Sequence, residues 1–347
     1  MRILNAIHSQ SIGGVEQVFR DYTQAFTMQG HEVALLISKN GHENYSAKKI
    51  FKLKNSAQIF DFLKLLLIVI SYRPKVIICH SRRLMKWMRL LKFFLPQKIF
   101  NYHTIAVNHG ITFDTSLHCD FIISINHQIK DLVDKHFDQK KSFVVHNAIN
   151  ISQKYQQKKF NNICPNIGIY GRIEPRKGFD VMLLAGKILQ EKNQDFRFKI
   201  GGFEVNENYN LTTLKNLALQ QQIIDKCHFV GVVKDKLDFF KDVDILCVPS
   251  REEPFGLVII EGFLYSTLVI ASDTDGAKLL ISDQQNGLLF KNESSQDLVE
   301  KILSIINNSQ NYNQICQQAY KVLQDRYSLE SLSQNLQNIL TKINNDS

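Results

Sequence analysis

The chain has 347 residues and a formal net charge of +9 at pH 7, and this length is enough for about two domains. Its six scattered cysteines form no C-x-x-C pair, which favours reduced thiols and a cytosolic setting. The longest apolar run, Leu65 to Ile70, is too short to cross a bilayer, and no repeat or low-complexity tract is present. The first residues already form an apolar strand pattern, so we expect no signal peptide.

Short apolar runs alternate with helical patterns along the whole chain. Strands are predicted at residues 2–8, 32–37, 75–80, 98–103, 121–125 and 142–146, and again at 167–170, 196–201, 227–231, 244–248, 268–271 and 287–290. This alternation is typical of parallel sheets and predicts an α/β fold of two doubly wound domains. The domains are predicted at 1–152 and 166–328, with a polar linker at 153–165 and a last helical segment at 329–347.

A glycine pair, Gly13 and Gly14, follows the first predicted strand and opens a helix near Val15 to Met28. Paired glycines let the backbone approach a ligand closely, and a helix N-terminus behind them favours anions. Turns also use glycine freely, and the chain has no G-x-G-x-x-G dinucleotide fingerprint at this place. The pair alone is therefore weak support for a phosphate site.

The positive charge is concentrated in the first half of the chain. Residues 1–150 contain 20 Lys or Arg against 10 Asp or Glu, and residues 48–98 contain 13 against one acid, Asp61. Within this segment a helix is predicted at 82–95, capped by Ser81, with an apolar stripe opposite a basic face. It is either a packed helix with a solvated basic face or an interfacial helix on an anionic membrane. The candidate membrane residues are Arg82, Arg83, Lys86, Trp87, Arg89 and Lys92, with Trp87 suited to the headgroup region. Aromatic motifs that stack on single-stranded nucleic acid are not evident, so we expect no nucleic-acid partner.

One histidine is singled out by its predicted position. His103 is predicted to end the strand 98–103 and to project from its carboxyl end, where α/β proteins bind ligands. His109 is the competing candidate. No histidine pair has metal-ligand spacing with a carboxylate or cysteine partner, and the D-x-D sequence at 242–244 leads into a buried strand. We therefore expect no metal requirement.

Three cations follow the strand predicted at 167–170. The segment 171–180 reads G-R-I-E-P-R-K-G-F-D and precedes a helical pattern. Arg172 offers a planar fork to phosphate oxygens, Lys177 offers a mobile charge, and the helix N-terminus adds partial positive charge. Because charged loops are ordinarily just solvated, composition alone gives equal support to a diphosphate site and to a solvated loop.

The most specific pattern of the chain is a pair of carboxylates separated by seven residues. The segment 249–261 reads P-S-R-E-E-P-F-G-L-V-I-I-E and is predicted as a loop after a strand, followed by a helix. Glu253 then lies at the strand's carboxyl end, and Glu261 lies in the helix among apolar neighbours. A buried carboxylate needs donors, and vicinal sugar hydroxyls are suitable ones. The alternative is that Glu253 only serves the helix N-terminus and Glu261 is solvated.

These motifs resemble the retaining glycosyltransferases of family 4, whose patterns include E-x7-E, G-R-x(4)-K-G and G-G-x-E, and the resemblance runs nearly end to end. It implies a GT-B fold, in which two Rossmann-like domains face a crevice and the C-terminal helix packs back on the first domain. It assigns the donor sugar to Glu253 and the ribose to Glu261. It assigns the diphosphate to Arg172 and Lys177, but gives Arg176 no role, and it places His103 near the reacting carbon. The other implied donor-binding residues are Gly13, Gly14, Phe255, Gly256 and Leu257, with Gly14 favoured over Gly13.

The function implied by this resemblance is metal-independent, retaining transfer of a sugar from a nucleoside diphosphate sugar, with UDP favoured, to a glycan hydroxyl. No cofactor is expected. A membrane-docking basic domain implies a lipopolysaccharide core, lipid-linked or other cell-surface acceptor, and a cytoplasmic protein at the inner face of the inner membrane. The alternatives are a sugar-nucleotide epimerase and a non-catalytic basic adaptor. Asp275 and Leu279, which stand where the family has Gly and Glu, favour the adaptor, and the intact carboxylates and cations favour an enzyme.

Overall fold

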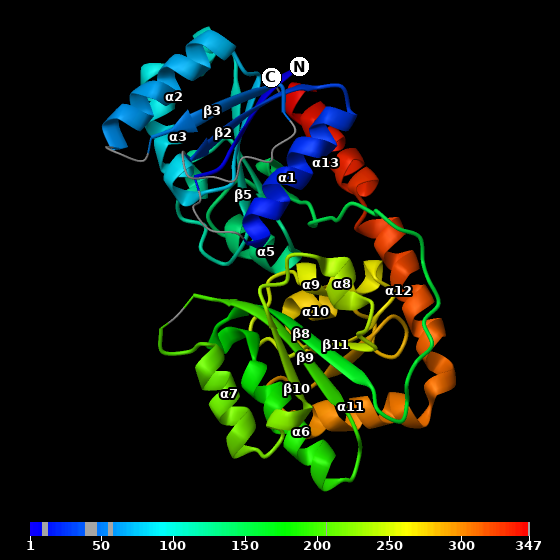
Figure 1. The fold of residues 1–347 in the computed structure, drawn as a ribbon. Helices are drawn as coiled ribbons and strands as arrows, with labels where there is room; N and C mark the ends of the chain where they lie inside the picture. Colours follow the sequence, from blue (N-terminus) through cyan, green and yellow to red (C-terminus); the bar gives the residue numbers. More distant parts are fainter. Residues whose placement is uncertain (9–12, 39–46, 55–57, 206, 346–347) are drawn as a thin grey trace. The chain divides into compact units, whose positions relative to one another are not determined.

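The computed structural model describes residues 1–8, 13–38, 47–54, 58–205 and 207–345. The chain divides into two compact units (Figure 1): unit 1 comprises Met1–Asn150 and Tyr327–Ser347, and unit 2 comprises Ile151–Arg326. Each unit is built from strands and helices in alternation, as the sequence patterns predict.

Among its described residues, unit 1 contains a seven-stranded sheet in the order β3-β2-β1-β4-β5-β6-β7. All neighbouring strands are parallel. The order reverses between β1 and β4, so the carboxyl ends of these two strands form the switch point of the sheet. The strands are β1 (Arg2–Ala6), β2 (Glu32–Ser38), β3 (Lys49–Leu53), β4 (Val76–Cys79), β5 (His103–Asn108), β6 (Phe121–Ser124) and β7 (Ser142–Val144).

The prediction of a strand at 98–103 is wrong. Residues Gln97–Phe100 form one helical turn, α4, flanked by Pro96 at its N-cap and by Asn101 at its C-cap, which has a left-handed conformation with φ 48°. Ile99, which the prediction placed inside a strand, is exposed on this turn. The true strand is the longer apolar run that begins at His103. The structure also contains β3, at the edge of the sheet, which the sequence patterns did not predict.

The helices of unit 1 follow its strands, and the last helix of the chain completes it. Besides the single turn α4, they are α1 (Gly14–Met28), α2 (Gln58–Tyr72), α3 (Arg82–Phe94), α5 (His127–Asp134) and α13 (Leu329–Asn345). The C-terminal helix α13 packs against α1, as the resemblance implied. Gln29 Nε2 donates to Ser333 Oγ at 3.0 Å, and Ser333 Oγ donates to the carbonyl of Ala25 at 3.2 Å.

Unit 2 contains, among its described residues, a six-stranded sheet in the order β10-β9-β8-β11-β12-β13, again with parallel neighbours. The strands are β8 (Asn166–Ile173), β9 (Arg197–Glu204), β10 (Cys227–Gly231), β11 (Ile245–Val248), β12 (Leu268–Ser272) and β13 (Leu288–Phe290). The helices are α6 (Phe179–Glu191), α7 (Leu211–Gln220), α8 (Lys236–Phe240), α9 (Leu257–Leu264), α10 (Asp275–Leu280), α11 (Ser295–Asn307) and α12 (Tyr312–Arg326). The switch point of this sheet lies between β8 and β11.

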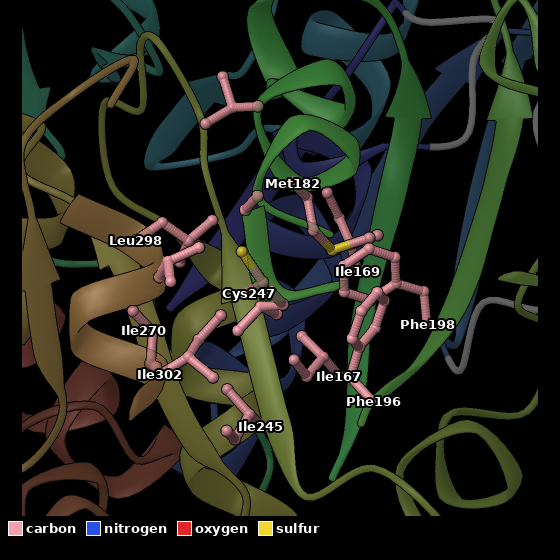
Figure 2. Packing of buried hydrophobic residues seen from close by; sticks show 14 of the residues in the cluster. Ile167, Ile169, Met182, Phe196, Phe198, Ile245, Cys247, Ile270, Leu298 and Ile302 are labelled. Carbon is pink, nitrogen blue, oxygen red and sulfur yellow. The ribbon is translucent and has the colours of Figure 1, made fainter. Parts of the chain in front are cut away.

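The core of unit 2 fixes these two central strands. Figure 2 shows Ile167 and Ile169 of β8 and Ile245 of β11 among aromatic and aliphatic side chains from neighbouring elements. Helices α6 and α11 pack against each other and contribute Met182 and Leu298. Because each fully buried side chain of this kind contributes about 1.5–3 kcal/mol, the strand ends are held on a rigid base.

Residues 153–165, predicted as a linker, lie along unit 2. The ring of Phe160 stacks on Tyr312 with centroids 4.5 Å apart. Lys158 Nζ donates to the carbonyl oxygens of Phe240 at 2.9 Å and Val243 at 3.1 Å, and burial lowers the pKa of this lysine to about 8. The segment is therefore anchored to unit 2 by side chains that its polar composition did not reveal.

Candidate active site

Two loops of unit 2 leave the carboxyl ends of β8 and β11 at the switch point, which is the usual ligand site of parallel α/β sheets. Residues 174–178 follow β8, and residues 249–256 follow β11. The first loop carries the predicted cation Lys177, and the second carries Glu253. The structure thus brings the two clusters predicted from the sequence to neighbouring strand ends.

Lys177 and Glu253 form an ion pair between these loops. Nζ of Lys177 lies 2.5 Å from Oε2 of Glu253, and both side chains are mostly buried. Partial exclusion of water strengthens the attraction between the two charges. The pair places an ammonium group that can bind phosphate beside a carboxylate that can accept sugar hydroxyls.

Close backbone packing holds the two loops in contact. The N–H of Arg251 donates to the carbonyl of Arg176 at 2.8 Å. Gly178 has φ +66°, and a Cβ at this position would lie 1.9 Å from the carbonyl oxygen of Pro249. Both the conformation and the contact exclude a side chain, so only glycine fits here. This explains the glycine that follows Lys177 in the G-R-x(4)-K-G pattern.

A second ion pair joins the loop after β11 to the start of α6, which follows the loop after β8. Arg251 donates through both terminal nitrogens to the carboxylate of Asp180, at 3.0 and 2.7 Å, and also to the carbonyl of Pro175 at 2.5 Å. Burial alone would raise the pKa of Asp180, but the hydrogen bonds and charge of Arg251 hold it below its ordinary value. Bidentate pairs of this kind are geometrically demanding, so Arg251 fixes the spacing of the two loops. The sequence patterns did not single out either residue.

Arg172 lies at the end of β8 and faces a carboxylate of its own loop. Its Nη2 is 3.0 Å from Oε1 of Glu174, and Nη2 of Arg176 is 3.1 Å from the same oxygen. Arg172 is among the more exposed charges of the site, so its guanidinium can be reached by a ligand. Two guanidinium groups that share one carboxylate oxygen leave further N–H donors for phosphate.

Glu261 is buried in the second turn of α9, as its apolar neighbours predicted. Its Oε1 forms an ion pair with Lys236 at the start of α8. The pair explains how a carboxylate is tolerated at this depth, because an unpaired buried charge would be costly. Lys236 was not predicted from the sequence, since no pattern links it to the E-x7-E segment.

The turn between Glu253 and Glu261 depends on two glycines, Gly256 within the turn and Gly276, which packs against it. Gly256 precedes α9 with φ +99°, Phe255 is buried, and Leu257 is the first helical residue. Gly276 donates its N–H to the carbonyl of Glu253 at 2.8 Å, and a Cβ on Gly276 would lie 2.3 Å from that oxygen. Asp275, which stands where a glycine was expected, is exposed at the start of α10. The required close contact is therefore kept by the next residue.

Unit 1 presents the predicted glycine pair at the start of α1. The carbonyl of Gly13 accepts from the N–H groups of Glu16 at 3.1 Å and Gln17 at 3.2 Å. A Cβ on Gly13 would meet no described atom within 4 Å, and Gly14 is exposed. Packing among the described residues therefore does not require glycine at Gly13. Residues 9–12, which precede the pair, lie outside the described part of the chain.

The predicted placement of His103 is wrong. His103 is the first residue of β5 and pairs with Val76, the first residue of β4, so it lies at the amino edge of the sheet. His109 follows Asn108, the last residue of β5. The competing candidate is thus the one at the carboxyl edge, because the strand was predicted too early in the chain.

His109 contacts His80, the last residue of the strand predicted at 75–80, and this contact was not predicted from the sequence. Nδ1 of His80, which follows β4, lies 3.3 Å from Nε2 of His109, and the rings stack with centroids 5.4 Å apart. His80 is buried edge-on against the rings of Phe19 and Tyr22. Burial lowers the pKa of both imidazoles, that of His109 to about 4, so both are neutral at pH 7. In a neutral pair one ring donates and the other accepts, and this orients the ring of His109.

The exposed basic side chains of α3 are Arg82, Lys86 and Arg89. Trp87 does not share this face. It is 6% exposed, and its ring packs 6.1 Å from that of Phe62, so its predicted place among lipid headgroups is wrong. The reason is that Trp87 falls on the apolar stripe, which faces the core.

Two further cations of the predicted membrane set are held within unit 1. Nη1 of Arg83 lies 2.8 Å from Nε2 of His8, and Nζ of Lys92 lies 2.6 Å from Oδ1 of Asp120. Ser81 does not cap α3 through its side chain, because its Oγ accepts from the N–H of His8 at 3.1 Å. Arg83 and Ser81 support local structure at the β1 and β4 ends, and Lys92 supports it at the starts of β5 and β6, where Asp120 also accepts from the N–H of Thr104 at 2.8 Å.

Two family profiles match the chain in succession. Residues 12–153 match the profile described as Glycosyltransferase Family 4, and residues 151–322 match Glycosyl transferases group 1. The chain belongs to glycosyltransferase family 4. The two matches meet near residue 151, where unit 1 gives way to unit 2, so both units carry the family's pattern.

Relatives of this family 4 member include an uncharacterized glycosyltransferase of Haemophilus influenzae, 27% identical over 224 residues, which cover 64% of this chain and 61% of that protein. The lipopolysaccharide core biosynthesis glycosyltransferase LpsE of Rhizobium meliloti is 24% identical over 170 residues, 49% of this chain and 48% of that protein. Both matches span less than two thirds of the relative's length. Anabaena HepE, crystallised with UDP and glucose, has a TM-score of 0.81 at 17% identity, covering 98% of this chain and 99% of that chain. This likeness shows that the fold is GT-B.

Proposed function

We propose that this family 4 member transfers a sugar from a nucleoside diphosphate sugar to a glycan hydroxyl, without a metal and with retention of the anomeric configuration. The observation that carries the proposal is that the Lys177–Glu253 ion pair and Arg172 lie at the ends of the neighbouring strands β8 and β11, at the switch point. Two cations beside a held carboxylate suit a ligand that combines phosphates with hydroxyls. UDP is the favoured nucleotide, in line with the UDP complex of HepE, whose fold this chain shares.

The reaction breaks the bond between the anomeric carbon and the diphosphate oxygen and forms a bond from that carbon to the acceptor oxygen. The acceptor's proton passes to the leaving diphosphate. Arg172 and Lys177 are assigned to the negative charge that develops on the diphosphate. Glu253 is assigned to the sugar, where it accepts hydrogen bonds from the hydroxyl groups and faces the positive charge that develops on the anomeric carbon. Because Glu253 is already held by Lys177, these charges need little reorganisation during the reaction.

Two further residues, one in each unit, are given roles in the proposal. Glu261 is assigned to the ribose hydroxyls, which would add to its contact with Lys236. His109, held by His80, takes the sugar contact that was predicted for His103. No protein nucleophile is assigned, so retention is proposed to follow from attack of the acceptor on the face that the diphosphate leaves.

The acceptor is proposed to be a lipopolysaccharide core, a lipid-linked glycan or another cell-surface glycan. LpsE, the relative described above, acts in lipopolysaccharide core biosynthesis. The exposed cations Arg82, Lys86 and Arg89 support contact with an anionic membrane, and we assign the protein to the cytoplasmic face of the inner membrane. Among the described residues, no helix combines the length and apolar character that crossing a bilayer requires.

The test is thermal stability measured with UDP, GDP and ADP and their common sugar conjugates. A ligand at 100 times its dissociation constant adds about 2.7 kcal/mol to the free energy of unfolding. We expect one nucleotide sugar to raise the Tm, and Glu261→Ala to remove the shift. If no nucleotide sugar changes the Tm, the proposed donor site is wrong and the adaptor alternative replaces it.

A second measurement separates transfer from binding. With the donor identified, we expect Glu253→Ala to abolish transfer to a glycan acceptor and to leave nucleotide binding mostly intact. Equal loss of both would contradict the role given to Glu253. Conversion of the donor without any acceptor to an epimeric sugar would instead support the epimerase.

A further inference from the structure

Helix α2 is apolar on its outer as well as its inner face. Ile59, Phe60, Leu63, Leu67 and Ile70 are all exposed, Phe60 and Leu67 to 66%. At about 100° per residue they fall on one side of the helix, and the opposite side packs in the core of unit 1. A helix that is apolar all round normally has apolar surroundings on all sides. Water on the outer face is therefore not its expected environment.

The exposed apolar surface continues onto the end of α3. Leu90, Phe93 and Phe94 are exposed there, Phe93 to 76%. Helices α2 and α3 are neighbours (Figure 1), and the ring of Phe94 lies 6.0 Å from that of Phe62 of α2. Within α3, the ring of Phe94 lies 5.2 Å from that of Phe93. We call the exposed side chains of α2 and of the α3 end the α2–α3 apolar surface. Single exposed apolar residues are normal, but eight of them on two helices that contact each other mark an interaction site.

Positive charge accompanies the α2–α3 apolar surface. Residues 58–100 carry nine Lys or Arg and one acid, Asp61. Asp61 is buried and accepts from the N–H of Lys54 at 2.8 Å, so its charge faces inward. Lys86 and Arg89 stand on the exposed face of α3 beside the apolar side chains. The surface is therefore apolar and cationic, with no exposed carboxylate in this segment.

We propose that the α2–α3 apolar surface inserts into the headgroup and upper acyl region of an anionic bilayer, with Lys86 and Arg89 at the phosphate level. This inference rests on the membrane contact proposed above and adds its mode: burial of apolar side chains, led by Phe60, Leu67 and Phe93. Apolar burial supplies affinity, and the cations select anionic lipid. Fifteen residues of α2 span only about 22 Å, so the helix lies in the interface and does not cross it.

Charge argues for a bilayer over a second copy of the chain. A two-fold dimer brings the same patch of each copy together, so Lys86 and Arg89 of one protomer would face the cations of the other. Segment 58–100 offers no exposed acid to pair with them. An anionic lipid surface complements both properties of the patch at once.

The experiment is co-sedimentation of the full chain with phosphatidylcholine vesicles that contain or lack phosphatidylglycerol. We expect binding to the anionic vesicles, and we expect Phe60→Gln with Phe93→Gln to weaken it by about tenfold or more for each aromatic removed. Lys86→Gln with Arg89→Gln should weaken it by about fivefold for each charge. The matched control is Leu219→Gln with Leu237→Gln, two equally exposed leucines of unit 2, which should leave binding unchanged.

Insertion is read separately with Phe93→Trp and lipids brominated on their acyl chains. Trp87 is buried, so quenching should appear in the Phe93→Trp variant and be absent from the wild type and from Leu219→Trp. Loss of binding in the charge variant alone, without quenching of the introduced tryptophan, would overturn insertion and leave a purely electrostatic contact. A lipid-free dimer that Phe60→Gln with Phe93→Gln converts to monomer in sedimentation equilibrium would assign the surface to a second copy instead.

Thermal shift with nucleotide sugars on the same variants, without vesicles, separates this inference from the proposed function. We expect donor binding to be unchanged by the Gln variants. If wild-type protein binds vesicles as described but no nucleotide sugar, the proposed reaction fails and the insertion surface stands. If it binds the donor but no vesicles, the reaction stands and the insertion surface fails.

Discussion

The carboxyl edges of the two sheets are built from different chemistry. The edge of unit 2 carries permanent charges bound in pairs: Lys177 with Glu253, Lys236 with Glu261, and Arg251 with Asp180. The edge of unit 1 carries a glycine helix start and two histidines that burial keeps neutral at pH 7. Unit 2 contains 21 Lys or Arg and 21 Asp or Glu, whereas residues 1–150 contain twice as many basic as acidic residues.

This difference shows that the chain's positive charge is not a property of its candidate donor site. Balanced pairs in unit 2 can hold a diphosphate without an excess of charge around it, because each cation is positioned by a carboxylate. The excess cations of unit 1 lie instead along the segment that carries the α2–α3 apolar surface. Net charge and site charge therefore report on different partners, a membrane and a nucleotide sugar in our proposals.

The largest effect is expected from Lys177→Ala. Removing this cation takes a donor from the leaving diphosphate, and loss of one such preorganised group lowers a rate by about 10²–10³-fold. Arg176→Ala, which removes a neighbouring cation of the same loop, should change transfer by less than about threefold. Steady-state transfer rates of the two variants test this prediction. A similar loss of rate in both would mean that the loop acts only through its overall charge.

The histidine edge is tested by comparing His109→Ala with His103→Ala. If His109 contacts the donor sugar, its removal should lower transfer by about 10²-fold, in the range of a positioned polar group. Because His103 lies at the amino edge of the sheet, His103→Ala should lower the transfer rate by no more than about twofold. Thermal unfolding of both variants controls for folding. The reverse order would restore the assignment that the structure overturned.

The Asp180–Arg251 pair should act on the geometry of the charged edge. Asp180→Asn keeps the shape but loses the charge, and we expect about tenfold lower transfer because the two loops lose their fixed spacing. Glu293→Gln removes the more distant, exposed partner of Arg251 at 3.5 Å and should change little. A positioning role predicts a lower rate at saturating donor, whereas a purely structural role would lower the Tm and leave the rate of the folded protein unchanged.

The smallest effect concerns pH. Because burial lowers the pKa of His80 and His109, the unfolded chain binds protons more readily than the folded chain below about pH 6.5. The stability that depends on these neutral rings is present above pH 6.5 and is lost as the pH falls towards 4. The free energy of unfolding falls between pH 7 and pH 5, and we expect His109→Gln to reduce this fall by about 1 kcal/mol, measured by urea unfolding. An unchanged slope would show that His109 titrates normally.

Local sequence patterns predicted the strand–loop–helix segments of unit 2 because each of them is complete within a short stretch. Ile245 to Val248, the loop with Glu253 and the helix with Glu261 follow one another without interruption, and the burial of Glu261 followed from its apolar neighbours. The same reasoning failed at 98–103, where Pro96 and Asn101 convert an apolar stretch into a helical turn and shift the strand to His103.

The partners of the candidate residues were decided by tertiary structure. Lys236 lies 25 residues from Glu261 in sequence, and Asp180 lies 71 from Arg251, so no periodicity or spacing connects them. They meet because parallel strands bring their carboxyl ends to one edge of the sheet, whatever their order in the chain. The burial of Trp87 was likewise decided by packing, since a helical wheel separates two faces of a helix but does not say which face lies against the core. The sequence by itself thus determined the family, the two-unit fold and the charged residues, and the tertiary structure determined which of these charges meet and which apolar face remains exposed.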